Sequence, residues 1–247
     1  MKYPIVFWDV GGTLFSPEKQ DHDGCDKIPS PAEVRKQRAF RAKKVLAMFG
    51  HTVPEDLENR IDSLHTTLLE KEQDRFSHIM LAETIYKELG ISSREETFYL
   101  ADAIAGPRYR CWLYKGVESA LRQLSEAGIR MGIIANTYLT ERMMRTVLEG
   151  VGLLHYFETV ICSCDVEVSK PDPRIFQKAL DRLNLPQGHV PSILFVGDTI
   201  EYDVKGANSV GWDVALHLIN SEQTCDTASL IFREYDELVS FVLSESS

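Results

Sequence analysis

The residues of this sequence that could do chemistry lie in four short stretches, the first of them near residue 9. The apolar residues 5–8 end at Asp9, which is closely followed by the glycine pair Gly11-Gly12 and by Thr13. An apolar run too short for a helix, followed by glycines, predicts a buried strand that delivers one acid to a loop. Asp9 would then lie where open α/β sheets bind ligands, at the carboxyl end of a central strand. A lone Asp in this setting also fits a residue that caps a turn, so the other stretches decide its role.

The other three stretches place polar side chains at the ends of predicted strands or at a helix start. They are residues 132–137, which end in Asn136 and Thr137, residues 168–176, which include Lys170, and residues 195–203, which include Asp198 and Asp203. If Asp9 and Asp198 end neighbouring parallel strands, both carboxylates converge on one point at the sheet's edge. Their hard oxygen atoms favour Mg²⁺, which takes one or two protein carboxylates and keeps several waters. Lys170 could place a compact positive charge against a nucleophile and a phosphate, an arrangement that meets the requirements of phosphoryl transfer.

The order and context of these stretches resemble the haloacid dehalogenase (HAD) superfamily, in the branch with a helical (C1) cap inserted after the first motif. The most specific part of the likeness is the motif KPDP at residues 170–173, followed further along by VGDT at residues 196–199. The likeness covers residues 1–15 and 112–240. The cap resembles the family only in being helical and in its place along the chain.

The resemblance implies a role for each of the polar residues. Asp9 would be a nucleophile that forms an aspartyl-phosphate, with Lys170 as a second catalytic residue. The implied phosphate-binding residues are Asn136, Thr137 and Lys170, the implied magnesium ligands are Asp9, the backbone carbonyl of Gly11 and Asp198, and the supporting residues are Thr13 and Asp203. The cofactor would be Mg²⁺ and the substrate a small phosphorylated molecule.

Two positions depart from the family's pattern. Phosphatases of the family carry a second Asp that protonates the leaving group and then activates water, and this chain has Gly11 there. General acid–base help is worth about 10²- to 10⁴-fold, or roughly 3 to 5 kcal/mol of barrier. The second motif normally ends in Ser or Thr, and this chain has Ala135, which removes a hydrogen bond to a charged group worth about 1.5 to 3 kcal/mol. The backbone N–H of Asn136 remains, and Thr137 could substitute.

These departures leave several functions open. The first is a slow or unusual magnesium-dependent phosphatase, and the second is a catalytically silent relative that binds a metal or a phosphorylated ligand. Haloacid dehalogenases lack the Gly-Asp of the fourth motif, which this chain keeps. A phosphonate hydrolase would need a cap lysine, for which Lys36, Lys43 and Lys44 are available.

A replacement for the missing acid could come from the polar loop that follows the first motif. This loop contains Asp21, His22 and Asp23, and a closed cap could bring one of them to the leaving oxygen. The alternative is that all three are solvated loop residues.

The elements that must position these residues follow two patterns. Residues 32–106 are helical in pattern, with helices expected at 34–49, 54–76, 79–89 and 93–106. From residue 114 the expected strands are 129–135, 159–162, 193–196 and 214–218, and the expected helices are 117–127, 140–151, 172–183, 203–210 and 235–243. The sequence thus predicts an α/β protein, with a HAD-like Rossmannoid core whose central parallel sheet is flanked by helices, and an inserted all-helical cap domain. The core would comprise residues 1–15 and 112–247, and the flap and cap residues 16–111.

Composition limits the classes of partner. The 247 residues, 44% of them hydrophobic and 26% charged, suit one large domain with an insertion. The net charge of −10 disfavours nucleic acid and anionic membranes, because both attract basic surfaces. No stretch approaches the apolar length of a membrane helix, residues after Met1 lead directly into a strand, and the five cysteines lack framework spacing. We therefore expect a cytoplasmic protein in a reducing compartment.

Overall fold

The sheet that carries the predicted site has six parallel strands in the order β3-β2-β1-β4-β5-β6. The structure, a computed structural model, describes residues 2–16, 30–92, 94–105, 113–183, 192–218 and 224–244. The strands are β1 (Ile5–Trp8), β2 (Arg130–Ala135), β3 (Thr159–Cys162), β4 (Ile193–Gly197), β5 (Asp213–His217) and β6 (Leu230–Phe232). Strand β1 pairs with β2 on one side and with β4 on the other, so the strand order reverses at β1. This confirms the predicted α/β fold with a central parallel sheet.

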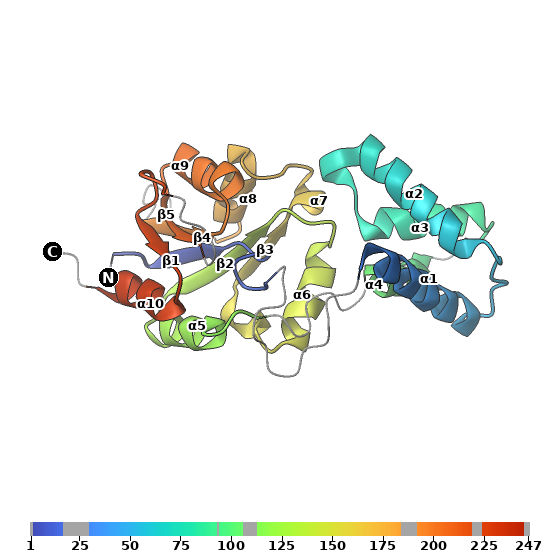
Figure 1. Cartoon of the computed structure of the whole chain (residues 1–247), viewed down its shortest axis with the longest axis horizontal. Helices are drawn as coiled ribbons and strands as arrows, with labels where there is room; N and C mark the ends of the chain where they lie inside the picture. The colour runs from blue at the N-terminus through green and yellow to red at the C-terminus, as the bar shows by residue number, and fades with distance from the viewer. Residues whose placement is uncertain are drawn as a thin grey trace.

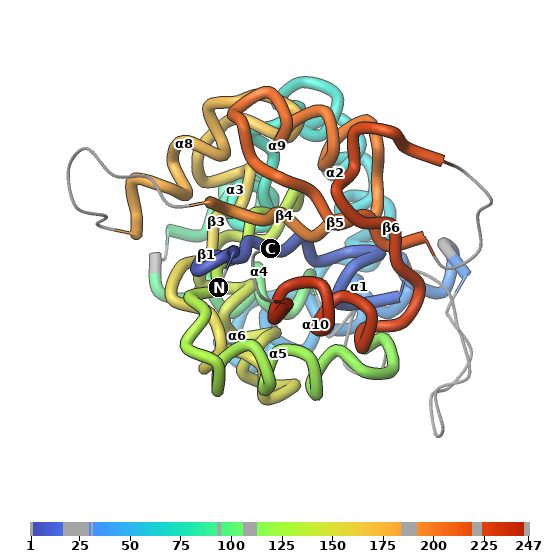
Figure 2. The backbone as a smooth tube through the Cα atoms, turned by 90° about the vertical axis from the view of Figure 1, so that its left-hand side faces the viewer, coloured from blue at the N-terminus to red at the C-terminus, as the bar shows by residue number. Residues whose placement is uncertain are grey.

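Helices cover both faces of the sheet (Figures 1 and 2). One face carries α5 (Val117–Glu126), α6 (Glu141–Gly150) and α10 (Tyr235–Leu243), and the other carries α8 (Pro173–Asp181) and α9 (Lys205–Ser209). The side chains of β1 alternate between these layers. Val6 and Trp8 pack in the first apolar cluster and Ile5 and Phe7 in the second, and all of them are buried. An all-apolar strand is what a parallel sheet covered on both faces requires.

Residues 30–105, which we call the helical region, pack beside the sheet, beyond the carboxyl ends of its strands (Figure 1). They form α1 (Pro31–Met48), α2 (Leu57–Glu72), the 3₁₀ turn η1 (Gln73–Arg75), α3 (His78–Glu88) and α4 (Arg94–Ala105). Helix α1 begins with a capping box, in which the Ser30 hydroxyl accepts from the Glu33 N–H and the Glu33 carboxylate accepts from the Ser30 N–H. Within the part of the chain that the structure describes, no helix is both long and apolar enough to cross a membrane.

Several short elements complete the fold. They are the 3₁₀ turn η2 (Leu154–Tyr156), the helical turn α7 (Ser163–Val166) and the π-helical turn η3 (Ile200–Val204). The sequence pattern predicts one helix at 203–210, whereas the structure has η3 followed by α9. It also predicts a single helix at 54–76, whereas α2 begins at Leu57 and gives way to η1 at Gln73.

Candidate active site

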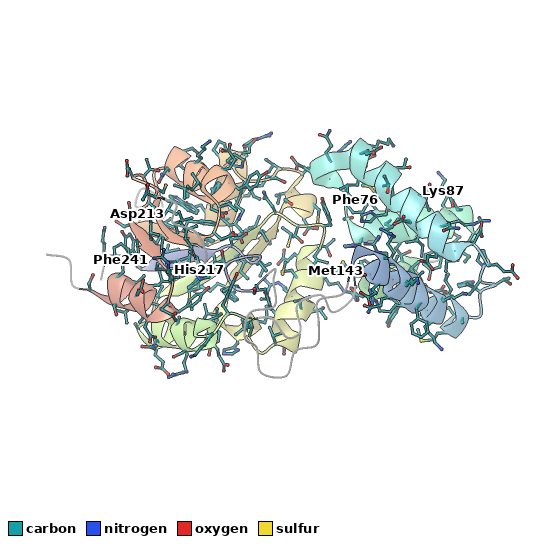
Figure 3. The ribbon with its side chains drawn as sticks, in the orientation of Figure 1. Phe76, Lys87, Met143, Asp213, His217 and Phe241 are labelled. Carbon is teal, nitrogen blue, oxygen red and sulfur yellow. The ribbon has the colours of Figure 1, made fainter. Side chains whose placement is uncertain are left out.

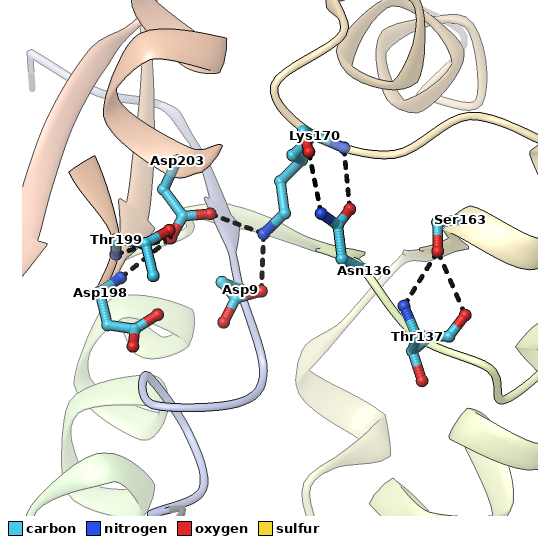
Figure 4. Close-up of polar contacts among 8 residues, drawn as sticks. All are labelled: Asp9, Asn136, Thr137, Ser163, Lys170, Asp198, Thr199 and Asp203. Carbon is cyan, nitrogen blue, oxygen red and sulfur yellow. Dashed lines mark hydrogen bonds and ion pairs between the residues drawn. The ribbon is translucent and has the colours of Figure 1, made fainter. Parts of the chain in front are cut away.

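Three carboxylates meet at the carboxyl edge of the sheet, where the strand order reverses (Figure 4). Strands β1 and β4 pair with Trp8 opposite Val196, so Asp9 and Asp198 leave the sheet side by side. The backbone N–H of Asp9 extends the ladder by donating to the carbonyl of Val196 at 2.8 Å. One oxygen each from Asp9, Asp198 and Asp203 lies within 4.8 Å of the others. The parallel register therefore brings together acids that are far apart in the sequence.

Lys170 lies between two of these carboxylates. Its Nζ is 2.6 Å from Oδ1 of Asp9 and 2.6 Å from Oδ1 of Asp203, and the residue is 3% exposed. The side chain of Asn136 holds the backbone of Lys170, because its Nδ2 donates to the Lys170 carbonyl at 2.9 Å and its Oδ1 accepts from the Lys170 N–H at 2.8 Å. The Asn136 amide, predicted to bind phosphate, thus positions the lysine in this structure (Figure 4).

Asp203 uses both of its oxygens within the protein. While Oδ1 accepts from Lys170, Oδ2 accepts from the N–H of Asp198 at 3.1 Å, from the N–H of Thr199 at 2.9 Å and from the Thr199 hydroxyl at 2.7 Å. A Cβ on Gly197 would lie 2.5 Å from Asp203, so only glycine permits this approach. Asp203 therefore fixes two parts of the site: the loop that carries Asp198, and the ammonium group of Lys170.

Burial and mutual repulsion change the proton affinity of these groups. Burial raises the pKa of Asp9 to about 6. This net shift includes a lowering by the charge of Lys170 and a further raising by the charge of Asp203. Burial also raises the pKa of Asp198 to about 7, and repulsion from Asp9 and Asp203 adds to this effect. For Lys170 burial disfavours the charge, but attraction by Asp203 and Asp9 outweighs it and raises the pKa. Asp9 and Asp198 therefore hold a proton more readily than ordinary carboxyl groups, while Lys170 stays charged.

This donor set fits a magnesium ion. Carboxylate oxygens are the ligands that Mg²⁺ prefers, and a cation between Asp9 and Asp198 would offset the burial and the like-charge repulsion that raise both pKa values. Because the oxygens of Asp203 already accept four hydrogen bonds, Asp9 and Asp198 are the acids suited to hold an ion. No other cluster of His, Cys, Asp or Glu with metal-binding geometry occurs among the described residues.

Two side chains from the C-terminal part of the chain bind the backbone of the loop that follows Asp9. Gly12 has φ +81°, and a Cβ on it would lie 2.0 Å from Oδ2 of Asp198, so glycine is required there. The Gly12 carbonyl accepts from Nδ1 of His217 at 2.9 Å, and the Thr13 carbonyl accepts from the Tyr235 hydroxyl. Thr13 is fully buried, and its hydroxyl has no hydrogen-bond partner within the described part of the chain. Neither His217 nor Tyr235 was predicted from the sequence.

Thr137 lies just after β2 and is fixed by the first residue of α7, which follows the neighbouring strand β3. Its N–H donates to the Ser163 hydroxyl at 2.9 Å, and that hydroxyl donates to the Thr137 carbonyl at 3.1 Å. The Thr137 hydroxyl accepts from the N–H of Leu139 at 3.1 Å, which leaves its own proton to donate. Ala135, just before, is packed in the apolar core. A hydroxyl donor is therefore available near Lys170 from Thr137.

A cavity of about 930 Å³ separates this edge of the sheet from the helical region. Besides Lys170, its lining includes Asp74 and His78 from the helical region and Tyr138 and Tyr202 from the sheet side. The two parts touch where the Ser169 hydroxyl donates to Asp74 at 2.8 Å and where the His78 N–H donates to the Tyr138 carbonyl at 3.1 Å. These four additional lining residues were not predicted from the sequence, because no motif or spacing marks them.

A second contact between the two parts is aromatic. The ring of Phe76, on the side of the helical region that faces the sheet domain (Figure 3), meets the ring of Tyr138 edge to face at 5.0 Å between centroids. Lys36, Lys43 and Lys44 are exposed on α1 and do not line the cavity. The loop residues Asp21, His22 and Asp23 lie outside the described residues.

An open parallel sheet with acids and a lysine gathered at its reversal point defines an α/β protein with a ligand site at the sheet's carboxyl edge. Residues 3–211 match the family described as haloacid dehalogenase-like hydrolase. The chain belongs to this family, as its motifs predicted.

Two curated proteins that are similar over most of the chain support this assignment. A glyceraldehyde 3-phosphate phosphatase of Methanothermobacter thermautotrophicus is 31% identical over 225 residues, which is 89% of this chain and 86% of that one. Haloacid dehalogenase-like hydrolase domain-containing protein 3 of Homo sapiens is 28% identical over 228 residues, covering 84% of this chain and 78% of the relative. The match to the Danio rerio protein of the same name, at 32% identity, spans 40% of this chain and only 38% of that relative.

Solved structures share the fold. A HAD phosphatase from Thermococcus onnurineus aligns over 100% of both chains with a TM-score of 0.55 and 23% identity. A 2-haloacid dehalogenase from Pseudomonas syringae aligns over 98% of both chains with a TM-score of 0.64 and 18% identity. At these identities the likeness establishes the fold alone, so the function must be argued from the site.

Proposed function

We propose that this protein is a magnesium-dependent phosphatase that acts on a small phosphorylated metabolite through an aspartyl-phosphate on Asp9. The observation that carries the proposal is the meeting of Asp9, Asp198 and Asp203 within 4.8 Å, with Lys170 bonded to two of them. Two further facts support it. Relatives in the same family are named as phosphatases, and the HAD-hydrolase YfnB of Bacillus subtilis, which shares the fold, was solved bound to magnesium.

The proposed ion would be held by Asp9, Asp198 and the backbone carbonyl of Gly11. When bound, Mg²⁺ would offset the negative charge of the phosphate and of the two carboxylates. Asp9 attacks phosphorus and forms a new O–P bond, while the bond to the leaving oxygen breaks. Water then cleaves the aspartyl-phosphate and regenerates the Asp9 carboxylate.

Other residues orient and neutralise during these steps. Lys170 holds Oδ1 of Asp9 at 2.6 Å, which leaves Oδ2 to attack, and its charge stabilises the equatorial oxygens of the phosphate. Asn136 fixes the lysine through its side chain, so its proposed phosphate contact falls to its backbone N–H. The hydroxyl of Thr137 takes the place of the Ser or Thr missing at Ala135.

We further propose that residues 16–111 act as a flap and cap over a core of residues 1–15 and 112–247. Asp74 and His78 line the cavity opposite Lys170 and would contact the part of the substrate that is not phosphate. The hydrogen bond from Ser169 to Asp74 and the contact between Phe76 and Tyr138 then hold the cap against the core.

The test is hydrolysis of 4-nitrophenyl phosphate with and without Mg²⁺, together with the mass of the intact protein after acid quenching. We expect turnover that requires Mg²⁺ and a phosphorylated species in the wild type, and neither in Asp9→Asn. The proposal fails if the wild type neither turns over the ester nor acquires a phosphoryl group.

Gly11 and Ala135, which replace an acid and a hydroxyl, favour one second candidate, a catalytically silent protein that binds a phosphorylated ligand. Thermal unfolding combined with the intact mass of the protein separates the two, since a silent binder would gain stability from Mg²⁺ and phosphate without ever forming a phosphoenzyme.

A further inference from the structure

We propose that His217 is a positioning residue for the acid cluster, because it holds the backbone of Gly12, against which the carboxylate of Asp198 rests. His217 is the last residue of β5 (labelled in Figure 3) and is 2% exposed. The role rests on the magnesium site of the proposed function, and it assigns the geometry of that site to a side chain outside the acid cluster. It follows from three sets of contacts behind the loop.

The first contact joins Gly12 to Asp198. An ideal Cβ on Gly12 would lie 2.0 Å from Oδ2 and 2.4 Å from Cγ of Asp198, so the carboxylate packs directly on the Gly12 backbone. Gly12 therefore forms one wall of the space that this carboxylate occupies. A displacement of Gly12 must change where the oxygens of Asp198 lie relative to those of Asp9.

The second contact joins His217 to Gly12. Gly197 pairs with Leu216 in the sheet, so His217 follows on β5 beside the position where Asp198 follows on β4. Its Nδ1 lies 2.9 Å from the Gly12 carbonyl. A carbonyl oxygen only accepts, so Nδ1 carries the proton and donates it. The imidazole thus fixes the peptide group of the residue that packs on Asp198.

Aromatic rings hold His217 in this orientation. The ring of Phe232 stacks on the imidazole at 4.9 Å between centroids, and the ring of Tyr114 meets it edge to face at 4.8 Å. Tyr235 lies at 5.1 Å with its ring tilted. A side chain packed by three rings in a buried place has little freedom to turn, so its hydrogen bond is preorganised.

The same cluster binds the two carbonyls that follow, those of residues 13–14. The Tyr235 hydroxyl donates to the first of them, and the backbone N–H of Tyr114 donates to the second at 3.1 Å. Three successive carbonyls of the loop are therefore held from β5, from α10 and from the segment before α5. His217 binds the one that belongs to Gly12, so it should affect the acids more than the other two donors do.

The position of Asp198 matters because an ion needs both acids at a set separation. Oxygens of Asp9, Asp198 and Asp203 lie within 4.8 Å of one another. Mg²⁺ demands nearly ideal geometry from its ligands, and loss of a group that orients a ligand lowers metal affinity by about 10- to 100-fold. Loss of the His217 donor should therefore weaken Mg²⁺ binding although every acid is still present.

The experiment measures the Mg²⁺ concentration that gives half-maximal thermal stabilisation of the chelator-treated protein. His217→Leu removes the donor and should raise this concentration by about tenfold or more. In His217→Asn the amide nitrogen takes nearly the place of Nδ1 and can donate to the Gly12 carbonyl, so this variant should regain most of the affinity. Leu238→Ala is the matched control, because Leu238 is fully buried in the apolar layer that contains Phe232 and Tyr235. It should lower the melting temperature without changing the response to Mg²⁺.

Two further measurements show whether His217 acts through Asp198. At saturating Mg²⁺, His217→Leu should hydrolyse 4-nitrophenyl phosphate with a kcat close to that of the wild type, while the Mg²⁺ concentration needed for half-maximal activity rises. In the Asp198→Asn background, His217→Leu should change the Mg²⁺ response little further, because the residue through which it acts has already been altered.

The outcomes separate this role from the proposed function. If His217→Leu binds Mg²⁺ as tightly as the wild type, or if Leu238→Ala weakens binding as much, the role of His217 is overturned and the phosphatase stands. If the wild type gains no stability from Mg²⁺ and forms no phosphoenzyme, the proposed function fails and the role of His217 fails with it. If His217→Leu does not fold, His217→Gln takes its place, because its longer side chain carries the amide past the Gly12 carbonyl.

Discussion

The two sides of the site differ in how firmly their groups are held. On the nucleophile side, which comprises Asp9, Lys170, Asp198 and Asp203, the two ion-paired carboxylates and the lysine are buried and joined by hydrogen bonds of 2.6 to 3.1 Å. On the other side of the loop, Gly11 is exposed, and among the described residues nothing lies within 4 Å of a Cβ placed there. The difference indicates that the fold holds Asp9 and its counter-charge in place, whereas the position of Gly11 is accessible.

The largest effect should come from removing the nucleophile. Asp9→Asn keeps the size of the side chain but cannot form an aspartyl-phosphate, so we expect turnover to fall by at least about 10³-fold. The measurement is Mg²⁺-dependent hydrolysis of 4-nitrophenyl phosphate with intact-mass detection of the phosphoenzyme. Asp213→Asn is the matched control, because Asp213 begins β5 and accepts from the Tyr3 hydroxyl at the opposite edge of the sheet. Equal losses in both variants would contradict the assigned role of Asp9.

Breaking the buried ion pairs of Lys170 should reduce activity less than Asp9→Asn does, but should reduce the free energy of unfolding more. Lys170→Met leaves Asp9 and Asp203 without their counter-charge, and removing one partner of a buried pair costs about 3–5 kcal/mol. Thermal and urea unfolding at pH 8 measure this loss. Lys205→Met is the control, because Lys205 pairs with Glu201 on the exposed surface, where such pairs contribute about 0–1 kcal/mol. A similar, small loss in both variants would show that the nucleophile side is held less firmly than its contacts indicate.

The burial of Asp9 and Asp198, together with repulsion between carboxylates, predicts how stability depends on pH and Mg²⁺. Folding raises the pKa of Asp9 from 3.8 to about 6 and that of Asp198 from 3.8 to about 7, so the folded state binds more protons over this range. Their contribution to stability is therefore fully present below about pH 4 and is lost as pH rises through 6 and 7. Mg²⁺ should restore stability above pH 7.

Melting curves in chelator and in Mg²⁺ across this pH range test the prediction. Asp198→Asn should raise the melting temperature of the metal-free protein at pH 8 and remove most of the stabilisation by Mg²⁺. If Mg²⁺ stabilises Asp198→Asn as much as the wild type, Asp198 does not hold the ion.

The smallest expected effect concerns the support behind the loop. Tyr235→Phe removes only the hydroxyl that donates to the Thr13 carbonyl, and a hydrogen bond of this kind is worth about 0.5–1.5 kcal/mol. If the bond orients the Gly11 carbonyl, the Mg²⁺ concentration for half-maximal stabilisation should rise by about two- to tenfold. Tyr3→Phe, which removes the hydroxyl bonded to Asp213, should lose similar stability without changing the response to Mg²⁺. Identical Mg²⁺ responses in both variants would limit Tyr235 to a structural role.

The firmly held side is also the side that the sequence predicted. Short apolar runs before Asp9 and Asp198 indicated buried parallel strands, and paired parallel strands must bring their carboxyl ends together. Local patterns served equally well for regular elements. The predicted bounds of β3 (Thr159–Cys162) and α10 (Tyr235–Leu243) agree with the structure.

The parts that the sequence did not predict depend on contacts without a local signature. His217 and Tyr235 reach Gly12 and Thr13 across 205 and 222 positions of the chain, and nothing in their neighbourhoods marks them. The predicted helix at 203–210 is replaced by η3 and α9 where Asp203 turns inward to accept from the N–H groups of Asp198 and Thr199. Short elements such as α7 (Ser163–Val166) and β6 (Leu230–Phe232) are too brief to show a period.

The place of β1 in the middle of the sheet has a consequence for how the protein forms during synthesis. Ile5 pairs with Arg130 on one side and with Ile193 on the other. Strand β1, which precedes Asp9, can therefore complete its pairing only after β2 and β4 have both left the ribosome. Pairings this distant in sequence slow folding and leave strand edges open to association with other chains. A nascent chain that ends before β4 would carry Asp9 on a strand with one unpaired edge. Such a chain would bind chaperones and would not yet be active.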